Sequence, residues 1–284
     1  MAIVSLAEAI TKHVPDGASV ALEGFTHLIP FAAGHELIRQ RRRDLHLIRM
    51  TPDLIYDQLI GMGCARALTF SWGGNPGVGS LHRLRDAGER GWPHRIELDE
   101  HSHAGMAVAY CAGAAGLPFG MLRGYIDTDL AAHNPRISSV QCPYTGERIA
   151  TVPALNPDVT VLHAQRADRK GNVAITGIVG AQREAAFAAR AVVVTVEEIV
   201  DELPPAMNGV VLPHWLVAAV VLCPGGAYPS YAQGYYPRDN AFYKAWDLIS
   251  REREGFKTWI DRHVRGTKDF AEFKRSLEGA TSHA

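Results

Sequence analysis

Short runs of β-branched and other apolar residues alternate with stretches of helical periodicity along most of the chain. The runs that predict buried strands are residues 18–22, 45–50, 67–71, 95–98, 159–163, 192–196 and 216–222. The segments that predict helices include residues 5–14, 30–43, 52–62, 81–90, 102–115 and 180–189. Strands that alternate with helices predict an α/β fold, with an open, largely parallel sheet and helices on both of its faces.

Two segments depart from this alternation. Residues 119–149 are less regular and contain several glycines and prolines, which predicts a small flap or an inserted hairpin. After residue 240 the aromatic side chains recur at helical spacing, and we expect them to pack in a core rather than to form a cofactor site. We therefore predict a single domain over residues 1–284, with a small flap at 119–150 and a helical C-terminal segment at 240–284.

The loops that follow the predicted strands are the places to look for function, because ligands of parallel sheets bind at the carboxyl ends of strands. The first such loop is LEGFTHLIP, residues 22–30, in which Glu23 is the acidic residue and Pro30 opens the next helix. Gly24 allows a close approach of the backbone, and amide groups at such a junction can stabilise an oxyanion. A plain strand-to-helix turn is the competing interpretation.

Two further loops are rich in glycine. SWGGNPGVGS, residues 71–80, lacks both the GK[ST] ending and the GxGxxG spacing of nucleotide-binding loops, so we expect it to face another ligand or a partner chain. In CPGGAYPSYAQGYY, residues 223–236, the side chains of Tyr228, Ser230 and Tyr231 either line a pocket or pack the loop onto the surface.

The loop LDEHSHAGM, residues 98–106, brings four polar residues to the end of a predicted strand. His101 and His103 are metal-ligand types, but they are two residues apart and we find no convincing further ligands for them. We therefore favour capping of the following helix by Asp99 or Glu100 over metal binding. A role for Glu100 near a substrate stays open.

Composition narrows the classes of protein further. The 284 residues carry a net charge of −1, and the basic run at residues 39–43 ends a predicted helix, so nucleic-acid binding is not expected. The four cysteines are widely spaced, which favours reduced thiols, and no uninterrupted apolar stretch approaches the length of a membrane span. No GxSxG motif is present and no signal peptide is evident, so we expect a cytoplasmic protein that binds no membrane.

Five segments in order along the chain carry a resemblance to a known family. Together they resemble the alpha subunits of family I coenzyme A transferases, especially those of glutaconate CoA-transferases, over about residues 5–265. The segments are VALEGFTHLIPFAAGHELIRQ at 20–40, AAGLPF at 114–119, LHAQRADRKGNV at 162–173, VVVTVEEIVD at 192–201 and PGGAYPSYAQGYY at 224–236.

The resemblance implies an enzyme subunit that works only with a beta-type partner chain. In this family the partner supplies a glutamate that attacks an acyl-CoA thioester and forms an acyl-enzyme anhydride. The anhydride becomes an enzyme-bound CoA thioester, and a second carboxylic acid then takes up the CoA. Coenzyme A is a substrate, and the chemistry needs no metal and no cofactor. The alpha half helps to shape the acyl pocket at the subunit interface.

The resemblance also implies which residues form the site. Gly24, Phe25 and Thr26 are the first candidates for catalysis. Two positions differ from the usual pattern: Glu23 stands where many relatives have glycine, and Tyr228 stands where histidine is usual. These departures leave the acyl substrate, and the reaction itself, open. One alternative is an acyl-CoA hydrolase or decarboxylase, with Glu23 taking part in the chemistry, and another is a non-catalytic CoA-ester-binding subunit. The expected substrate-binding residues are Ser71, Gly73, Gly74, Asn75, Gly77, Glu100 and Tyr228.

Overall fold

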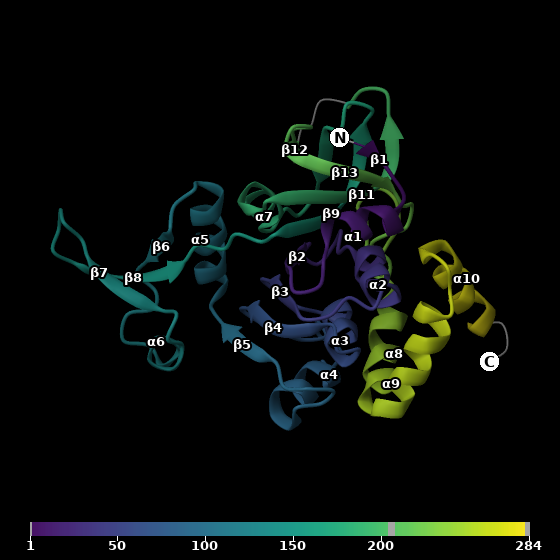
Figure 1. The fold of residues 1–284 in the computed structure, drawn as a ribbon, viewed down its shortest axis with the longest axis horizontal. Coiled ribbons are helices and arrows are strands. Elements are labelled where there is room, and N and C mark those ends of the chain that lie inside the picture. Colours follow the sequence, from purple (N-terminus) through teal and green to yellow (C-terminus); the bar gives the residue numbers. More distant parts are fainter. Residues whose placement is uncertain (1, 204–207, 282–284) are drawn as a thin grey trace.

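A ten-stranded sheet forms the centre of the computed structural model, which describes residues 2–203 and 208–281. Parallel neighbours lie in the order β1-β13-β11-β9-β2-β3-β4-β5 (Figure 1). The predicted α/β architecture with a largely parallel sheet is therefore confirmed. The bounds of these strands are Ala2–Ile3, Val217–Leu222, Ala191–Val200, Val159–Asp168, Ser19–Glu23, Leu45–Arg49, Ala65–Phe70 and Glu97–Glu100.

Two short antiparallel strands extend one part of the sheet. β10 (Val173–Thr176) pairs with the end of β9 and with β12 (Gly209–Leu212). Neither strand was predicted, and β1 was also missed, because runs of two to four residues are too short to show a periodicity. The pairing with β10 explains why β9 continues to Asp168, beyond the predicted end at residue 163.

Helices cover both faces of the main sheet (Figure 1). On one face lie α1 (Leu6–His13), α2 (Phe31–Arg39), α3 (Leu54–Gly61) and α4 (His82–Arg85), the last continued by a π-helical turn at Asp86–Arg90. On the other face lie α5 (His103–Ala114) and α7 (Gln182–Ala188). None of the helices among the described residues has the length and apolar character needed to cross a bilayer.

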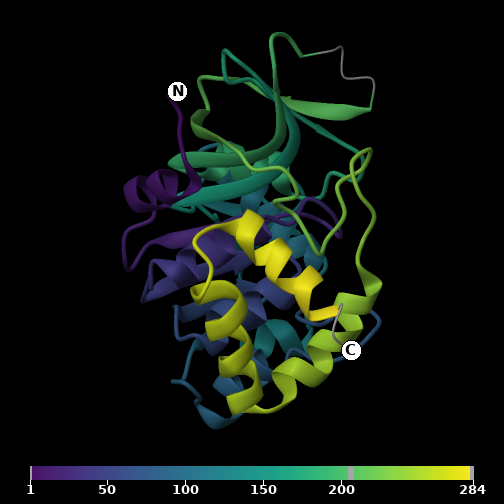
Figure 2. The same ribbon diagram turned by 90° about the vertical axis from the view of Figure 1, so that its right-hand side faces the viewer.

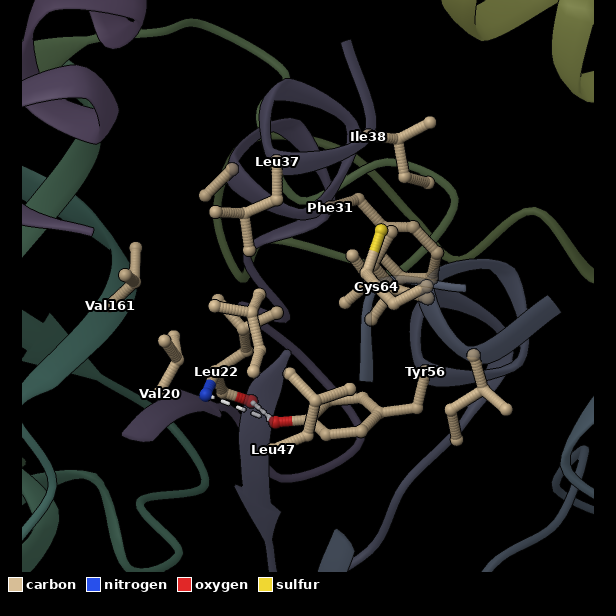
Figure 3. Close-up of a cluster of buried hydrophobic side chains, with 14 of the residues drawn as sticks. Val20, Leu22, Phe31, Leu37, Ile38, Leu47, Tyr56, Cys64 and Val161 are labelled. Carbon is tan, nitrogen blue, oxygen red and sulfur yellow. Dashed lines mark hydrogen bonds between the residues drawn. The ribbon is translucent and has the colours of Figure 1, made fainter. Parts of the chain in front are cut away.

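Strand β2 shows how the alternation of side chains fills both layers. Val20 and Leu22 face the α1 and α2 side, whereas Ala21 faces α5 and α7. A strand buried on both faces is apolar at nearly every position, as the sequence indicates here. The hydroxyl of Tyr56, from α3, accepts a hydrogen bond from the Leu22 amide at 3.1 Å (Figure 3). The same hydroxyl donates one to the Ile48 carbonyl at 2.8 Å. This side chain locks α3 onto β2 and β3.

The flap is a separate three-stranded antiparallel sheet in the order β6-β8-β7. It contains β6 (Phe119–Leu122), α6 (Asp129–His133), β7 (Ser138–Gln141) and β8 (Arg148–Pro153). Figure 1 shows it projecting outward beyond α5. Its inner face has a small core of its own, made by Ala109 and Tyr125 with Ile137, Ala150 and Val152.

The C-terminal segment is helical, as predicted, and packs across the outside of α2 and α3 (Figure 2). Its helices are α8 (Asn240–Arg251), α9 (Arg253–Ile260) and α10 (Phe270–Thr281), with a π-helical turn at Asp261–Arg265. Its aromatic residues lie in the core, as the spacing indicated. Trp246, Phe256 and Phe273 are all fully buried.

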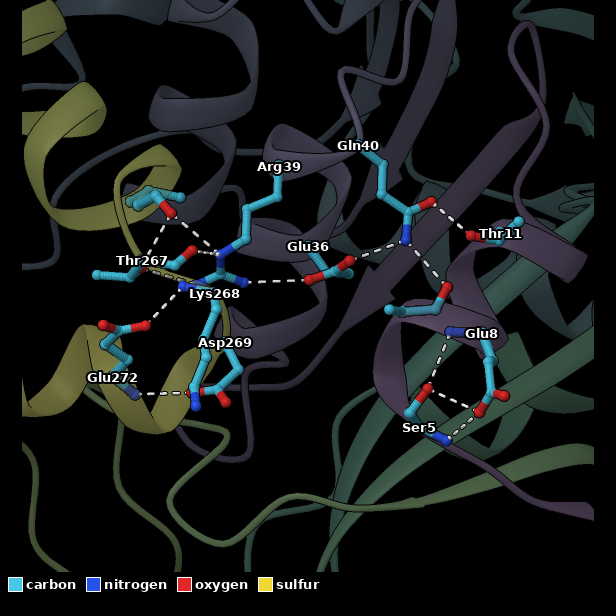
Figure 4. Close-up of polar contacts among 12 residues, drawn as sticks. Ser5, Glu8, Thr11, Glu36, Arg39, Gln40, Thr267, Lys268, Asp269 and Glu272 are labelled. Carbon is cyan, nitrogen blue, oxygen red and sulfur yellow. Dashed lines mark hydrogen bonds and ion pairs between the residues drawn. The ribbon is translucent and has the colours of Figure 1, made fainter.

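The basic run at residues 39–43 does not form the end of a helix that reaches residue 43. Helix α2 ends at Arg39, and Arg41 has a left-handed backbone conformation with φ 54°. Where the helix ends, the Arg39 guanidinium donates to the Thr267 carbonyl at 2.9 Å (Figure 4). It also donates to the Val264 carbonyl at 3.0 Å. The first basic residue of the run thus attaches the C-terminal helices to α2.

Candidate functional site

The order of the strands reverses between β2 and β9. Strands β3, β4 and β5 follow on one side of β2, while β9, β11, β13 and β1 follow on the other. In parallel sheets such a reversal leaves a crevice at the carboxyl ends of the strands, where ligands bind. Residues 24–26, which directly follow β2, lie at this place.

A cavity of about 210 Å³ opens there. Three successive post-strand loops and the start of the C-terminal segment form its wall. This volume is below the roughly 300–1,000 Å³ of sites for drug-sized ligands, so it suits a short acyl group rather than a whole CoA molecule. The lining residues are Phe25, Thr26, Ile29, Arg49, Thr51, Asp53, Trp72, Pro76, Arg238 and Tyr243.

The loop after β2 has a tightly constrained backbone. A Cβ atom on Gly24 would lie 2.7 Å from the Leu28 carbonyl oxygen and 2.9 Å from that of His27, so only glycine fits. Thr26 and Leu28 both have left-handed backbone conformations, with φ 63° and 52°. Such strain in residues other than glycine persists only where neighbouring contacts hold it.

The loop at residues 223–236 supplies those contacts. The Leu28 amide donates to the Tyr231 carbonyl at 3.0 Å, and the Ser230 hydroxyl donates to the Thr26 carbonyl at 3.2 Å. The ring of His27 stacks on that of Tyr231 at 4.9 Å. Ser230 and Tyr231 thus support the loop after β2 from behind and are not among the residues that line the cavity.

The segments LHAQRADRKGNV, at residues 162–173, and VVVTVEEIVD, at residues 192–201, contact each other and the loop at residues 223–236. His163, on β9, lies 2.7 Å from a carboxylate oxygen of Glu197, on β11, and the Tyr236 hydroxyl donates to the same carboxylate at 2.6 Å. The Gly225 amide donates to its other oxygen at 2.7 Å. Burial raises the pKa of Glu197, but these hydrogen bonds and the His163 ring outweigh it, so the pKa lies below its usual value. The ionised carboxylate holds the loop in place.

Glu23 turns away from the cavity. Its side chain is 3% exposed, and Oε1 accepts hydrogen bonds from the Tyr110 hydroxyl at 2.8 Å and the Met50 amide at 3.0 Å. Burial raises the pKa of this carboxyl, and the charge of Arg49 offsets only part of that effect. Glu23 is not one of the lining residues, whereas Phe25 and Thr26 are.

A buried ion pair forms the base of the cavity. Arg49 donates to the carboxylate of Asp53 at 3.0 Å and to the Gly24 carbonyl at 2.9 Å, and the two charged side chains are 1% and 3% exposed. Burial disfavours the charged guanidinium, but the Asp53 carboxylate, together with Glu23 and two nearby tyrosines, outweighs this and raises the pKa of Arg49. Arg49 therefore connects the loop after β2 to the start of α3. Sequence reasoning missed both residues, although Arg49 lies in the predicted strand at residues 45–50 and Asp53 at the start of the predicted helix at residues 52–62.

The glycine-rich loop after β4 contributes apolar surface to the cavity, through Trp72 and Pro76. The Ser71 hydroxyl donates to the Met50 carbonyl at 2.6 Å, and the buried Asn75 amide donates to the Tyr243 carbonyl at 2.7 Å. Gly77 has φ 74°. A Cβ on Gly73 or Gly74 would lie within 3.0 Å of the side chain of Leu84 or Trp72, respectively. The predicted residues of this loop shape it, and the cavity wall is made by the residues between them.

The two other predicted substrate-binding residues lie elsewhere. Glu100 is the exposed last residue of the edge strand β5, and its carbonyl accepts from Asn134 at 2.7 Å. The Tyr228 hydroxyl donates to Asp239 at 2.5 Å, and its ring packs edge-on against Phe242. Neither residue lines the cavity.

The predicted capping of α5 by Asp99 or Glu100 is wrong. Ser102 is the N-cap, and its hydroxyl accepts from the Gly105 amide at 3.0 Å. Asp99 instead accepts hydrogen bonds from Thr69 and Asn134 and lies 3.0 Å from His101, which connects the sheet to the flap. Among the described residues, no three His, Cys, Asp or Glu side chains are grouped so that they could hold a metal ion.

Comparison with known proteins assigns this arrangement to a family. Residues 3–222 match the family model described as coenzyme A transferase. The chain belongs to the coenzyme A transferase family. It is 63% identical to the A-type subunit of the 3-oxoadipate CoA-transferase of Pseudomonas knackmussii, over 97% of this chain and 98% of that protein. It is 32% identical to the A-type subunit of the glutaconate CoA-transferase of Acidaminococcus fermentans, over 98% and 92% of the two chains.

Solved structures agree with this assignment. The crystal structure of the Acidaminococcus fermentans glutaconate CoA-transferase superposes with a TM-score of 0.90 at 31% identity, over 97% of this chain and 92% of that one. The decarboxylase AibA/AibB superposes with a TM-score of 0.79 at 34% identity, over 92% of this chain and 98% of that one. The expected alpha-type (A-type) subunit of a CoA-transferase is thus confirmed. Because it is one subunit of such an enzyme, this CoA-transferase chain has a heteromeric partner.

Proposed function

We propose that this chain is the A-type subunit of a CoA-transferase that moves coenzyme A between an acyl-CoA and 3-oxoadipate or a closely related dicarboxylic acid. The observation that carries the proposal is the 63% identity to the A-type subunit of a 3-oxoadipate CoA-transferase, which extends over almost the whole of both chains. The cavity at the strand-order reversal supports it, because its volume suits a short acyl group.

The reaction needs a carboxylate nucleophile in front of the cavity. A glutamate of the beta-type partner attacks the thioester carbonyl, the C–S bond breaks, and CoA leaves as the thiolate from an acyl-glutamyl anhydride. The thiolate then attacks the glutamyl carbonyl, which releases the first acid and leaves CoA bound to the enzyme as a thioester. The second acid reverses these two steps, so the glutamate is regenerated and no atoms are gained or lost.

The chain's own carboxylates are poorly placed for this role. Of the described residues that line the cavity, Asp53 alone carries a carboxylate, and Arg49 holds it at 3.0 Å. Glu23 accepts hydrogen bonds from the Tyr110 hydroxyl and the Met50 amide. Both observations support a nucleophile from the partner, with the loop at residues 24–26 providing the wall against which the acyl group is placed and the amides that face its developing oxyanion.

Hydrolysis or decarboxylation on the same scaffold is not favoured. The decarboxylase AibA/AibB is 34% identical to this chain, far below the identity to the 3-oxoadipate CoA-transferase relative. Glu23, the residue by which this loop differs from the usual family pattern, is also buried and does not line the cavity, so it is not placed to contact a substrate there.

The test uses the complex of this chain with its beta-type partner. The complex is incubated with 3-oxoadipyl-CoA, with and without acetate, and the products are followed by mass spectrometry. Transfer predicts acetyl-CoA in the presence of acetate, inactivation by hydroxylamine in the presence of the acyl-CoA, and little free CoA without an acceptor. Free CoA or carbon dioxide formed at the same rate without acetate would contradict the proposal.

Replacement of Glu23 by glutamine separates the two interpretations of this residue. Glutamine keeps an acceptor for Tyr110 and the Met50 amide, so we expect the transfer rate of the Glu23→Gln complex to stay within about tenfold of the parent. A several-thousandfold loss of the transfer rate with an unchanged fold would show that the carboxyl group takes part in the chemistry.

The cytoplasmic location expected from the sequence stays a prediction, which fractionation of cells that express the native protein would check.

A further inference from the structure

The cavity wall carries one more positive charge than negative charge. Its charged lining residues are Arg49, Asp53 and Arg238. Arg49 and Asp53 neutralise each other at 3.0 Å, and the hydroxyl of Tyr243 lies 3.5 Å from the other oxygen of Asp53. Asp53 also interacts with the charge of Arg238, but more weakly than with that of Arg49, and no ion pair within 4.0 Å joins Arg238 to a carboxylate of the described lining. A cavity with one uncompensated cation is complementary to a ligand with one negative charge.

Arg238 is held in a fixed position. Its guanidinium carbon lies 3.9 Å from the centre of the Tyr243 ring, and Tyr243 is itself 1% exposed. Nη2 donates to the Pro76 carbonyl at 3.4 Å, in the loop that also contributes Trp72 to the wall. The ring fixes the face of the guanidinium, and the carbonyl uses one of its five N–H donors. The guanidinium has further N–H donors along its edge, in the forked geometry with which arginine binds a carboxylate.

We propose that Arg238 determines the preference for dicarboxylic substrates by pairing with the carboxylate at the end of the acyl chain that is remote from the thioester. Phe25, Ile29 and Trp72 provide apolar surface for the methylene groups between the two ends. This inference rests on the proposed function, because it assigns one residue to the recognition of the substrate class named there. Arg238 is a specificity residue and not a catalytic one, since it contacts the end of the substrate that does not react.

The pairing favours dicarboxylates because a monocarboxylic acyl group would leave the Arg238 guanidinium without a partner, which costs free energy of binding. An acyl chain that ends in a methyl group would leave the fixed guanidinium without its partner, and such sites discriminate strongly against analogues that lack the group they bind. Removal of the guanidinium would affect the acids that carry the remote carboxylate and would barely affect those that lack it. A purely structural role for Arg238 would lower the rates with both classes equally.

The kinetic test compares two thioesters with the same six-carbon chain, 3-oxoadipyl-CoA and 3-oxohexanoyl-CoA, in the complex with the beta-type partner. We expect Arg238→Gln to lower kcat/KM for 3-oxoadipyl-CoA by about 100-fold, mainly through KM, as loss of a hydrogen-bonded charge pair predicts. The value for 3-oxohexanoyl-CoA should change less than about threefold, and Arg238→Lys should restore part of the preference. Equal losses with both thioesters, or an unchanged ratio, would overturn the inference.

A binding experiment separates this inference from the proposed reaction. Isothermal titration calorimetry of the complex with adipate and with hexanoate measures recognition without turnover. Binding of adipate that Arg238→Gln abolishes supports the inference even if no CoA is transferred, and failure of the parent complex to prefer adipate overturns it even if transfer is observed. Arg190→Gln is the matched control: Arg190 directly precedes β11, its side chain is 79% exposed, and it pairs with Asp158 at the amino ends of the strands.

Discussion

Gly24 shows how one missing side chain positions a loop. The carbonyl oxygens of His27 and Leu28 occupy the space where a Cβ atom would lie, at 2.9 and 2.7 Å. Gly24→Ala must therefore push these carbonyls away and move the neighbouring Phe25 and Thr26 out of the cavity wall. We expect kcat/KM for transfer to fall by about 100-fold, with a loss of unfolding free energy of about 1–3 kcal/mol.

Gly124→Ala provides the control for that substitution. Gly124 lies in the flap segment, and a Cβ atom there would meet nothing within 4 Å. We expect its kinetics and its denaturation midpoint to match those of the parent within error. Normal transfer by the Gly24→Ala complex would show that the shape of this loop does not matter for the reaction.

The sequence identifies the residues of the loop after β2 but not all of their neighbours. Gly24, Phe25 and Thr26 follow a strand directly and carry a family motif, so their place at the end of β2 was predictable. Arg238 has no such signal, because it reaches the cavity from a segment far along the chain that has no periodic pattern. The direction of the Glu23 side chain depends on Tyr110 of α5, a contact over 87 positions that no local pattern encodes.

At the scale of elements, Arg39 adds a polar attachment to the apolar packing that holds the C-terminal helices on α2. Arg39 donates to the carbonyls of Val264 and Thr267 and pairs with Glu36 at 3.2 Å (Figure 4). Arg39→Met would leave Glu36 and both carbonyls without this partner. We expect a loss of about 3 kcal/mol in unfolding free energy, measured by urea denaturation.

A neighbouring arginine of the same basic run is the matched control for Arg39. The Arg43 side chain is 75% exposed and lies 4.0 Å from Asp16. Arg43→Met should change the unfolding free energy by less than about 0.5 kcal/mol. Similar effects of the two substitutions would contradict the role given to Arg39.

The attachment of the flap to the sheet should depend on pH through Asp99. Burial raises the pKa of Asp99, but His101, Asn134 and Arg136 outweigh it, so its folded-state pKa lies below the unfolded value. The stability that this carboxylate contributes is therefore present above about pH 4 and is lost as the pH falls through the lower folded-state pKa. We expect Asp99→Asn to cost about 1–2 kcal/mol at pH 7, and the difference from the parent to shrink below about pH 4.

Urea titrations of the parent and Asp99→Asn at pH 7, 5 and 3.5 would measure this difference. Asp127→Asn serves as the control, because the Asp127 side chain is 83% exposed in the same flap. Its substitution should have no pH-dependent effect. A deficit for Asp99→Asn that stays constant down to pH 3.5 would exclude the proposed charge effect.

The limits of prediction at this scale follow from the length of each element. The parallel strands and long helices were predictable because each presents several turns or alternations of apolar side chains. The end of α2 was not, because the sequence favours helix up to residue 43, whereas the helix ends at Arg39 and Arg41 has a left-handed backbone conformation. The N-cap of α5 was missed because Ser102 lies beside two acidic residues that are equally good cap candidates, and the contact that directs Asp99 elsewhere is made with the distant Asn134.

Across the whole molecule, the position of the cavity follows from strand order, which sequence patterns alone do not give. The reversal between β2 and β9 places the loops after β2, β3 and β4 around one space. The same arrangement leaves this space open toward the solvent in the single chain, with Trp72 46% exposed at its wall. A partner that covers it would complete the site.

We therefore expect the isolated chain to fold and yet to transfer no CoA. Because the partner binds only the folded chain, the melting temperature of this chain should rise with partner concentration, which scanning calorimetry can measure. Full activity should be reached at equal numbers of the two chains. Transfer by the isolated chain, or a melting temperature that is independent of the partner, would contradict a shared active site.

The place of Trp72 also gives the protein an intrinsic optical reporter. Trp246 is fully buried, and its indole N–H donates to Asp57 at 3.0 Å, so its fluorescence should be insensitive to ligands. Trp215 is 68% exposed, and the substitution Trp215→Phe removes its fluorescence. Trp92 packs against Phe256 and Trp259 against Trp246, and neither lines the cavity, so their emission should also change little. The emission that responds to an acyl group then comes from Trp72 in the cavity wall, and stopped-flow fluorescence can follow the filling of the site without any added dye.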